Sequence, residues 1–351
     1  MKKKKVLVLF GGCSSEYDIS LQSAYSVVTN LNPKNYEIIL IGITRDGNWM
    51  RYYGPYEQIA DDTWLSNGPC VPAIISPSRD IHGIIEFHGN TTKNTKIDVV
   101  FPVLHGKNGE DGTVQGLLEL AHIPFVGCNT LSSALCMDKD MAHKIVESAG
   151  VKTPSSVAMQ YEISENEIMD KTKFLNYPLF VKPAKAGSSL GITKILGKDE
   201  LSHAVTTAFQ YDNKVVIEEA IEGSEVGCAI LGTNSLTVGE VDEIKLSQTK
   251  GFFDYTEKYA GKTYKIHMPA PIDKDISMAI KQTAVTIYRA LGCSGLARVD
   301  MFLTPNKEII FNEVNTIPGF TIRSRYPNML KGIGMTFEQI LDSLIKLAIN
   351  V

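Results

Sequence analysis

The chain has 351 residues, of which 44% are hydrophobic and 21% charged, and its formal net charge is −4. This length suits two or three domains, and the composition is that of a globular protein with a substantial core. The weak charge gives no reason to expect nucleic acid or an anionic membrane as a partner.

The sequence predicts neither export nor membrane insertion. Only VLVLF follows the basic start KKKK before Gly11 and Gly12 interrupt the apolar run. A signal peptide needs an apolar run of about 7–15 residues and a membrane span about 20, so neither is expected. The six cysteines are scattered without a CxxC pair, which favours reduced, mostly buried thiols over zinc or redox sites. We therefore expect a cytoplasmic protein.

The N-terminal third predicts an open α/β sheet. KKVLVLFGG is a continuous apolar run that ends in glycines, as buried parallel strands do, and YEIILIGIT and IDVVFPVLHG are two further strands. Ser14 and Ser15 can cap the helix after the first strand, and Ser15 with Asp18 resembles a capping box. Alternation of strands with a helix predicts the open sheet. Residues 52–96 are polar and predict irregular structure.

The remainder predicts one long helix followed by short strands. SSALCMDKDMAHKIVESAG forms the helix, with Gly150 as its C-cap, and Pro154 starts a new unit. Strands are predicted at YPLFVKP, KVVIEEAI, EVGCAIL and LTVGEVDEI, with helices near 199–210 and 275–291. LARVDMFLT and EIIFNEVN form a hairpin across Pro305-Asn306. The fold class is α/β, with α+β character in the C-terminal two thirds, in three lobes: 1–130, 131–215 and 216–351.

Two glycine-rich segments follow predicted strands of the first lobe. FGGCSSE offers backbone N–H groups to an anion at a helix N-terminus, but it lacks the GxGxxG fingerprint of a nicotinamide enzyme. Glu16, on the first helical turn, could be no more than a partner of the helix dipole. VLHGKNGEDGT places His105 at a strand tip ahead of three glycines. Two interpretations remain for this segment: His105 has a structural role, or the segment is a ligand-binding loop.

The segment LFVKPAKAGSSLGITK predicts a phosphate-binding loop. Lys182 leaves an apolar strand five residues before a glycine loop at 187–191, whose N–H groups can surround phosphate oxygens. Lys139 is a further cation. The Walker pattern is absent, and a plain hairpin turn is the alternative.

The predicted C-terminal hairpin carries the strongest chemical pattern. Arg298 and Asp300 share one face of their strand, and Glu313 and Asn315 share a face of its partner. Two carboxylates and a carboxamide oxygen suit Mg²⁺, which prefers hard oxygen ligands and substrate phosphates. The alternative is a structural ion pair between Arg298 and one of the acids.

Taken together, these segments resemble the D-alanine–D-alanine ligase family of the ATP-grasp superfamily. The resemblance extends over nearly the whole chain, through FGGCSSE, HGKNGEDG, MDKD, FVKPAKAGSSLG, FFDYTEKY, ARVDMF and NEVNTIPGFT. It implies a three-lobed ATP-grasp fold with ATP between the second and third lobes. It also implies that ATP phosphorylates the carboxylate of one D-alanine, after which the amine of a second amino acid attacks the acyl phosphate. A homodimer is expected from the family alone.

The resemblance implies roles for residues on both sides of ATP. Lys139 and Lys182 would hold phosphates, while Glu218, Glu219 and Glu225 would line the adenine and ribose site. Two Mg²⁺ ions, which Mn²⁺ could replace, would be bound by the hairpin residues Asp300, Glu313 and Asn315.

Further implied roles concern the substrates and the reacting carbon. Arg298 and the N–H of Gly319 would stabilise the oxyanion of the tetrahedral intermediate. Glu16 would hold the ammonium group of the first D-alanine, and His105 would line the same pocket. In a mobile loop at 247–262, Lys258 would approach the γ-phosphate, and a closing hydrogen-bonded trio would comprise Glu16, Ser188 and Tyr259.

The acceptor end of the resemblance departs from the usual pattern. D-alanine–D-alanine ligases usually read TSHSL where this chain reads TIRSR, so Ser324 is kept but Arg325 replaces leucine. Phe253 stands where tyrosine is usual. Both changes resemble the D-alanine–D-serine ligases of vancomycin resistance, especially the VanG type, although Arg323 departs from the usual histidine.

Several functions remain open from the sequence. D-serine as acceptor is the leading hypothesis, and an ordinary D-alanine–D-alanine ligase is the nearest alternative. D-lactate is disfavoured because depsipeptide-forming relatives tend to lose the loop tyrosine that Tyr259 preserves. A catalytically dead binding protein is a third possibility, although every expected catalytic position is filled.

Overall fold

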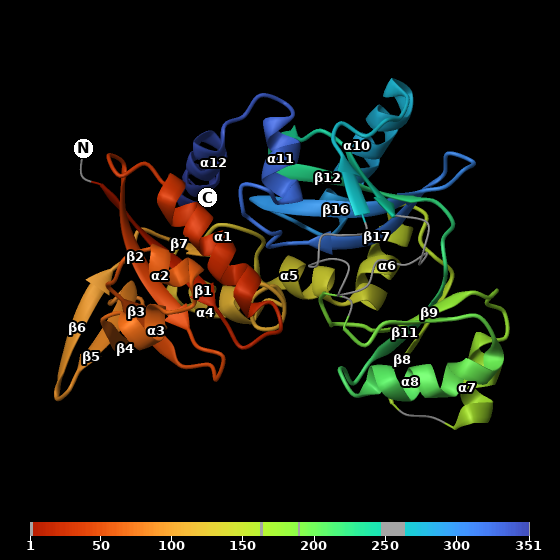
Figure 1. Ribbon diagram of the computed structural model, residues 1–351, viewed down its shortest axis with the longest axis horizontal. Coiled ribbons are helices and arrows are strands. Elements are labelled where there is room, and N and C mark those ends of the chain that lie inside the picture. Colours follow the sequence, from red (N-terminus) through yellow and green to blue (C-terminus); the bar gives the residue numbers. More distant parts are fainter. Residues whose placement is uncertain (1–2, 162–163, 189, 247–263, 351) are drawn as a thin grey trace.

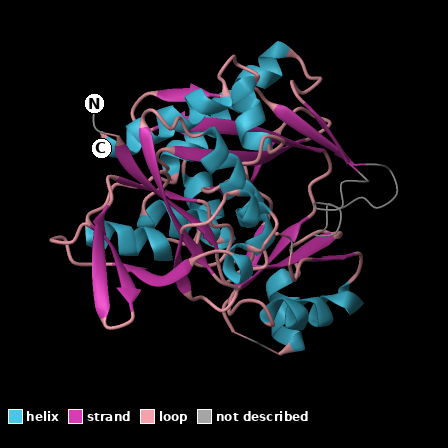
Figure 2. Cartoon of the chain, turned by 60° about the vertical axis from the view of Figure 1, so that its left-hand side comes forward, coloured by secondary structure: helices cyan, strands magenta, loops and turns pink. Residues whose placement is uncertain are grey.

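The computed structural model describes residues 3–161, 164–188, 190–246 and 264–350. Three β-sheets with associated helices succeed one another along the chain, and the sheet of the middle region stands apart from the other two in both views (Figures 1 and 2).

The N-terminal sheet has seven strands in the order β6-β5-β4-β3-β2-β1-β7. Its strands are β1 (Lys4–Gly11), β2 (Tyr36–Ile43), β3 (Trp49–Tyr52), β4 (Cys70–Ile75), β5 (Gly83–His88), β6 (Thr91–Lys96) and β7 (Val99–Pro102). β1 pairs in parallel with β2 and β7, and the other pairs are antiparallel. The open α/β sheet predicted from the sequence is confirmed. The helices of this region are α1 (Tyr17–Asn30), α2 (Glu57–Ala60), α3 (Trp64–Asn67) and α4 (Thr113–Ala121).

Two predictions for this region are wrong. Residues 52–96 are not irregular, because β4, β5 and β6 extend the sheet by antiparallel pairing. The capping box at α1 does not form: Glu16 occupies the N-cap without a side-chain cap. Ser14 instead donates a hydrogen bond to the carbonyl of His105 at 2.8 Å, and Asp18 pairs with Arg45. Ser14 Oγ also accepts the N–H of Glu16 at 3.2 Å, so it contacts the start of the helix without forming the predicted capping box.

The middle sheet has four antiparallel strands in the order β10-β9-β11-β8. They are β8 (Ser156–Met159), β9 (Leu179–Pro183), β10 (Thr193–Ile195) and β11 (Val215–Glu219), accompanied by α7 (Glu165–Thr172), the 3₁₀ turn η1 (Lys198–Glu200) and α8 (Leu201–Phe209). Their apolar side chains form a core of their own, drawn from residues between Met159 and Ile217.

The C-terminal sheet has six strands, with β15-β14-β12-β16-β17 in order and β13 paired to β12. They are β12 (Ser224–Gly232), β13 (Leu236–Val238), β14 (Asp242–Leu246), β15 (Tyr264–His267), β16 (Leu296–Leu303) and β17 (Ile309–Asn315). The helices are α10 (Lys274–Ala290), α11 (Arg325–Lys331) and α12 (Phe337–Ile349). The predicted hairpin of β16 and β17 is confirmed.

Two segments predicted as single elements are each divided. LTVGEVDEI forms β13 and β14, which pair with different parts of β12, and a Cβ at the intervening Gly239 would meet Met329 at 3.1 Å. The long helix is α5 (Thr130–Met137) followed by α6 (Lys139–Ser148). Asp138 separates them because its extended backbone lets its side chain cap α6 through the Met141 N–H.

The apolar cores connect the three regions unequally. One core joins α1 and β1 of the first region to β12, α11 and α12 of the last, so these two regions are packed as one body. A second core unites α5, α6 and α10 with β12, β16 and β17. The middle sheet shares neither of these two cores. It therefore meets the rest largely through polar contacts.

Two further sequence predictions can be compared with the structure. In the part of the chain that the structure describes, no helix is both long and apolar enough to cross a bilayer. All six cysteines are free thiols, and Cys128, Cys136, Cys228 and Cys293 are buried, as expected.

Candidate active site

The hairpin of β16 and β17 brings four polar side chains together. In its antiparallel register Arg298 lies opposite Asn315, and Asp300 opposite Glu313. Asp300 is 1% exposed, whereas the side chain of Glu313 is 29% exposed and lies 3.9 Å from the ammonium of Lys139. The hairpin therefore presents one enclosed and one accessible carboxylate.

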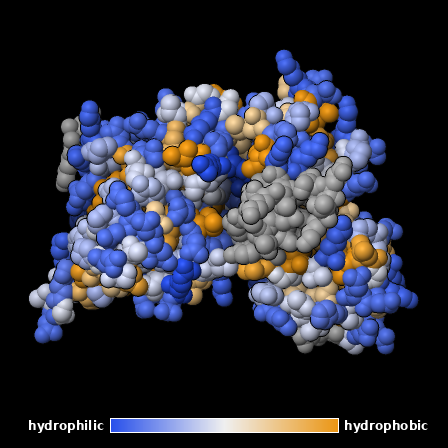
Figure 3. All heavy atoms as spheres, in the orientation of Figure 1, coloured by the Kyte–Doolittle hydropathy of each residue, from blue (hydrophilic) through white to orange (hydrophobic). Residues whose placement is uncertain are grey.

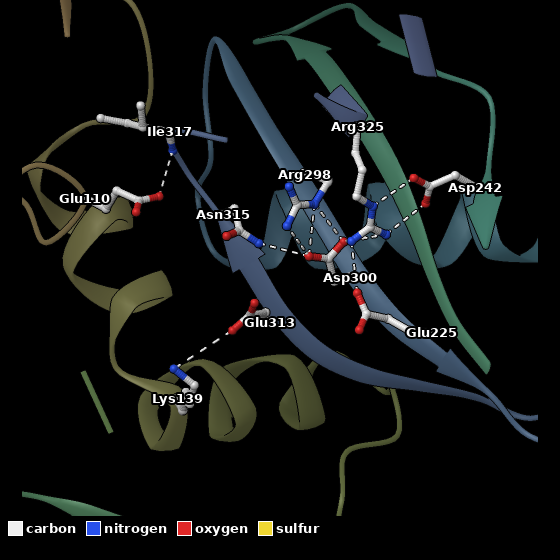
Figure 4. A network of polar contacts seen from close by, with 10 residues as sticks. All are labelled: Glu110, Lys139, Glu225, Asp242, Arg298, Asp300, Glu313, Asn315, Ile317 and Arg325. Atoms are coloured by element: carbon white, nitrogen blue, oxygen red, sulfur yellow. Dashed lines mark hydrogen bonds and ion pairs between the residues drawn. The ribbon is translucent and has the colours of Figure 1, made fainter. Parts of the chain in front are cut away.

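Asp300 is the centre of a network of polar contacts (Figure 4). Arg298 donates from Nε to Oδ1 at 2.9 Å and from Nη2 to Oδ2 at 2.7 Å, so the ion pair left open by the sequence is present. Asn315 donates from Nδ2 to Oδ2 at 3.0 Å. Arg325 places Nη2 3.3 Å from Oδ1. A metal ion bound by Asp300 would share this carboxylate with two guanidinium groups.

Arg325 is held by carboxylates from two other strands of the sheet. Asp242 on β14 accepts from Nε and Nη2, each at 2.8 Å, in a bidentate pair. Glu225 on β12 accepts from Nη1 at 2.9 Å. Burial opposes the charge of Arg325, but Asp242 and Asp300 outweigh burial and raise its pKa well above the usual value. The guanidinium is therefore charged and fixed, and it contacts a residue, Glu225, that the family pattern assigns to ribose.

A small polar pocket lies between the three regions, near the hydrophilic (blue) hollow in Figure 3. Its lining includes Glu16, Glu110, Lys139, Ser188, Glu313 and Asn315. Ser188, in the glycine loop, donates a short hydrogen bond to Glu16 Oε1. Ser188 has a φ of +53°, a conformation that non-glycine residues rarely adopt. The pocket thus joins the predicted first-substrate residue to the predicted phosphate loop.

His105 lies beside this pocket and is buried. Its Nδ1 is 2.9 Å from the carbonyl oxygen of Ile317, and its Nε2 is 3.2 Å from Ser23 Oγ. Burial lowers the pKa of His105, although the nearby charge of Glu16 acts in the opposite direction. A neutral ring can donate one of these hydrogen bonds and accept the other. His105 therefore ties β7 and α1 to the segment after β17.

Glu110 is a site residue that the sequence analysis did not identify. Its carboxylate accepts N–H groups from Gly106 at 2.8 Å and from Ile317 at 3.2 Å, which links the first region to the last. Burial, reinforced by the charge of Glu16, raises the pKa of Glu110 to about 8. The only available signal was its place in HGKNGEDG, between glycines.

The segment after β17 forms the turn that carries Gly319. Ser324 Oγ accepts the Thr321 N–H at 2.9 Å, and a Cβ on Gly319 would approach that oxygen to 3.1 Å. The Phe320 N–H donates to Ser23 Oγ at 3.1 Å. Among the described residues the Gly319 N–H has no acceptor, which fits the expected oxyanion donor. Ser324 therefore stabilises the turn, in addition to the role expected for it in binding the carboxylate of the second substrate.

The expected nucleotide residues Lys182, Glu218 and Glu219 belong to the middle sheet, and Lys139 begins α6 next to it. Lys139 is 9% exposed and donates from Nζ to the carbonyl of Ala186 at 3.1 Å. Lys182 forms a buried ion pair with Glu218. The second oxygen of Glu218, Oε2, is buried without a hydrogen-bond partner in the described part of the chain, as an acceptor for an adenine amino group would be. The side chain of Glu219 instead accepts from the backbone and side chain of Asn176.

Three expected site residues lie outside the described residues: Phe253, Lys258 and Tyr259.

Asp242 is a second site residue that the sequence analysis did not identify. It is 1% exposed within β14, and its partner Arg325 is 83 positions away along the chain. An acid at an inward position of a strand was the one available signal.

The residues present fit ATP and a hard divalent cation. Two lysines and an orphaned buried carboxylate oxygen suit phosphates and a base. Among the described residues there is no cluster of three His, Cys, Asp or Glu placed for a metal. The hairpin instead offers two carboxylates and one carboxamide, which are oxygen donors of the kind Mg²⁺ takes beside substrate phosphates.

These sheets, with a polar pocket between separately packed regions, define an ATP-grasp enzyme. Family models extend that assignment to most of the chain: the D-ala D-ala ligase N-terminus matches residues 5–128, and the D-ala D-ala ligase C-terminus matches residues 145–346. The chain belongs to the D-alanine–D-alanine ligase family, whose members are ATP-dependent ligases.

Individual relatives carry different names. The solved structure of the VanG D-Ala:D-Ser ligase from Enterococcus faecalis is 55% identical, with a TM-score of 0.92, over 99% of this chain and 100% of that one. The vancomycin B-type resistance protein VanB of Enterococcus faecalis is 44% identical over 100% of both chains. A D-alanine–D-alanine ligase from a Thermoanaerobacter species is also 44% identical, over 100% of this chain and 98% of the relative. Overall similarity therefore establishes the family of the chain, but it does not establish which amino acid is the second substrate.

Replacing Glu110 with glutamine should make stability depend on pH differently from the parent. The Glu110 pKa is raised in the folded state, so the folded chain binds more protons than the unfolded chain between the ordinary value, about 4.5, and about 8. The parent should lose stability relative to Glu110→Gln across that range and level off above it. Urea unfolding of both proteins from pH 5 to 9 measures the difference, and a constant difference would contradict the raised pKa.

Proposed function

We propose that this chain ligates D-alanine to D-serine with ATP, through a D-alanyl phosphate, and so supplies the altered peptidoglycan precursors of vancomycin resistance. The observation that carries the proposal is the fixed guanidinium of Arg325 at a position where D-alanine–D-alanine ligases usually have leucine. The 55% identity to a structure titled as a D-Ala:D-Ser ligase supports it.

Arg325 has the right number of donors for this task. A guanidinium has five N–H groups. Asp242 takes two of them, Glu225 takes one, and Asp300 faces a fourth. One Nη1 N–H is left for the hydroxyl of D-serine, directly or through water. A methyl group there would leave this donor without its partner, which costs about 1–3 kcal/mol when desolvated, or roughly tenfold to a hundredfold in preference.

The first half-reaction would use the pocket around Glu16. Glu16, held by Ser188, would accept the ammonium of the first D-alanine. Lys139 and Lys182 would hold the phosphates of ATP, for which Lys182 must exchange part of its contact with Glu218. The loop expected at 247–262, which lies outside the described residues, would close over the pocket and exclude water from the acyl phosphate.

The second half-reaction would take place at the turn that follows β17. The Gly319 N–H and Arg298 would stabilise the oxyanion as the acceptor amine attacks. Ser324 would hold the acceptor's carboxylate beside Arg325. Because Arg298 is anchored by Asp300, its guanidinium would require little reorganisation during the reaction.

Asp300, Glu313 and Asn315 would hold Mg²⁺, as two ions, and Mn²⁺ could replace it. When bound, the metal would offset negative charge on the transferring phosphate. Glu313 is the accessible carboxylate of this set and lies near Lys139, so it would stand closest to the phosphates.

An ordinary D-alanine–D-alanine ligase is the second candidate, favoured by the 44% identity to a relative of that name. The test is product analysis with ATP, D-alanine and D-serine supplied together at equal concentrations. A predominance of D-alanyl-D-serine supports the proposal. A predominance of D-alanyl-D-alanine would overturn it and leave the second candidate.

We also infer a cytoplasmic homodimer organised as lobes at 1–130, 131–215 and 216–351. The packing supports a separate middle lobe, although α5 and α6 place Cys136, Ala142 and Val146 in a core with the C-terminal sheet. Sedimentation of the purified chain would test the dimer.

Glu313→Gln should nearly abolish ligation. The amide keeps the shape but lacks the charge that offsets a divalent cation, a loss of several kcal/mol or at least about a hundredfold in kcat. The apparent KM for Mg²⁺ should rise together with the loss of phosphate release. Glu308→Gln, on the exposed end of the same hairpin, is the control and should behave as the parent. Normal Mg²⁺ dependence in Glu313→Gln would refute the metal assignment.

Ser188→Ala should weaken the first D-alanine site and increase unproductive ATP hydrolysis. The lost hydrogen bond to Glu16 is worth roughly 0.5–1.5 kcal/mol, or up to about tenfold in KM for that site. If Tyr259 completes the trio, Tyr259→Phe should have a similar effect, and the two changes together should be less than additive. Strict additivity, or an unchanged ratio of ATP consumed to dipeptide formed, would count against the trio.

Arg325→Leu should lower the preference for D-serine severalfold or more, but it also leaves Asp242 buried without its cation. A lost partner of this kind costs about 3–5 kcal/mol, so the combined variant Asp242→Asn/Arg325→Leu is the safer test of specificity. The measurement is the ratio of kcat/KM for D-serine to that for D-alanine as acceptor, with Asp242→Asn alone as the control. An active double variant that keeps the parent's ratio would exclude Arg325 as the selector and turn attention to Phe253.

A further inference from the structure

The two lysines expected to hold ATP phosphates belong to separately packed bodies. Lys139 is the first residue of α6, and the buried face of α6 packs in a core with β12, β16 and α10. Lys182 is on β9, whose neighbouring Val181 packs in the separate core of the middle sheet. Some contact must therefore fix one lysine relative to the other.

Lys214 makes that contact. It directly precedes β11 in the middle sheet, and only 6% of its surface is exposed. Its ammonium lies 2.9 and 3.1 Å from the two oxygens of Asp138 and 2.6 Å from Asp140 Oδ2. These two aspartates flank Lys139 in the sequence. One buried cation thus clamps the N-terminus of α6 on both sides of Lys139.

The backbone of the same residue leads to the other lysine. The Lys214 carbonyl accepts the Ala184 N–H at 2.8 Å, which continues the ladder that pairs β11 with β9 at Val216 and Lys182. The Ala184 carbonyl in turn accepts the Lys139 N–H at 3.1 Å. The side chain of Lys214 therefore contacts the residues on both sides of Lys139. Its main chain is hydrogen-bonded to the strand end that follows Lys182 and leads into the glycine loop.

We propose that Lys214 is a positioning residue of the ATP site, which holds Lys139 and Lys182 at the separation that the phosphates of ATP require. The proposal rests on the phosphate roles given to these two lysines under the proposed function. Lys214 would not touch the nucleotide, because its ammonium is taken up by Asp138 and Asp140.

The energetics favour a stable clamp over an exposed surface pair. Burial opposes the charge of Lys214, but the hydrogen bonds that it donates to Asp140 and Asp138 outweigh burial and raise its pKa. Asp138 also caps α6 through the Met141 N–H, so the clamp sets the direction in which the helix presents Lys139. A displacement of about 1 Å in such a positioning contact can reduce activity by up to a hundredfold.

The chain offers a matched control in Lys144. It pairs with the same Asp140, at 2.8 Å, but its side chain is 64% exposed and lies within α6 itself. Exposed pairs of this kind contribute about 0–1 kcal/mol. Lys144→Met therefore removes an ion pair from the same carboxylate without releasing the two bodies from each other.

The experiment compares Lys214→Met, Lys214→Arg, Asp138→Asn and Lys144→Met in the full-length chain. Binding of ATP is measured directly by calorimetry, and KM is measured separately for ATP and for D-alanine. We expect Lys214→Met to weaken ATP binding about tenfold while KM for D-alanine stays within about twofold, with partial rescue in Lys214→Arg. Lys144→Met should match the parent. Asp138→Asn keeps a good cap and should weaken ATP binding severalfold, and it decides the question if Lys214→Met does not fold.

Equal losses for ATP and D-alanine, or unchanged ATP binding in Lys214→Met and Asp138→Asn, would overturn the proposal. Lys139→Ala in the same titration separates this failure from that of the proposed function. If Lys139→Ala weakens ATP binding and Lys214→Met does not, only the positioning role is wrong. If Lys139→Ala also binds ATP normally, the phosphate role of Lys139 is wrong and the positioning role falls with it.

Discussion

Much of the candidate site depends on two carboxylates that have almost no contact with solvent. Asp300 and Asp242 are each 1% exposed, and a buried carboxylate without a cation is strongly destabilising. Arg298 supplies the compensating positive charge for Asp300, and Arg325 supplies it for Asp242, each through a bidentate pair. Arg325 also faces Asp300. The proposed metal ligand Asp300 therefore interacts electrostatically with both the proposed oxyanion donor, Arg298, and the residue proposed to select the acceptor, Arg325. A change of Arg325 for acceptor specificity therefore also carries a stability cost, unless its carboxylate partner Asp242 is changed with it.

The distribution of apolar packing explains where such a site can open. The first and last regions share a core, so Glu16, His105 and the turn carrying Gly319 are held on one body. The middle sheet has its own core and meets that body through polar contacts such as Ser188 with Glu16 and Lys214 with Asp138. The contact of Ser188 with Glu16, which lines the pocket, can be exchanged for contacts with a ligand at little net cost, whereas a shared apolar core cannot and the buried clamp of Lys214 is kept. ATP would therefore enter along the polar boundary.

Local patterns predicted the strands and the hairpin but not the long-range partners. The alternation around Arg298, Asp300, Glu313 and Asn315 was enough to place these side chains on one face, because a strand has a period of two. β6, TTKNTK, was missed because it is an exposed polar edge strand, whereas the apolar residues of β4 and β5 were a usable local signal. The break at Asp138 was hidden by a helical pattern that continues across it. No local signal could pair Arg325 with Asp242, since tertiary packing alone brings them together.

The pocket next to the hairpin is lined by three carboxyl groups, and this composition indicates what it should bind. Glu16, Glu110 and Glu313 line it with Lys139 as the cation among its lining residues. Burial is the main cause of the raised pKa of Glu110, and the charge of Glu16 adds to its effect. An ammonium group beside Glu16 and a divalent cation beside Glu313 would each be attracted by these carboxyl groups. Ligands of these two kinds should stabilise the fold as they bind, because the unfolded chain lacks this arrangement of carboxyl groups and would not bind them.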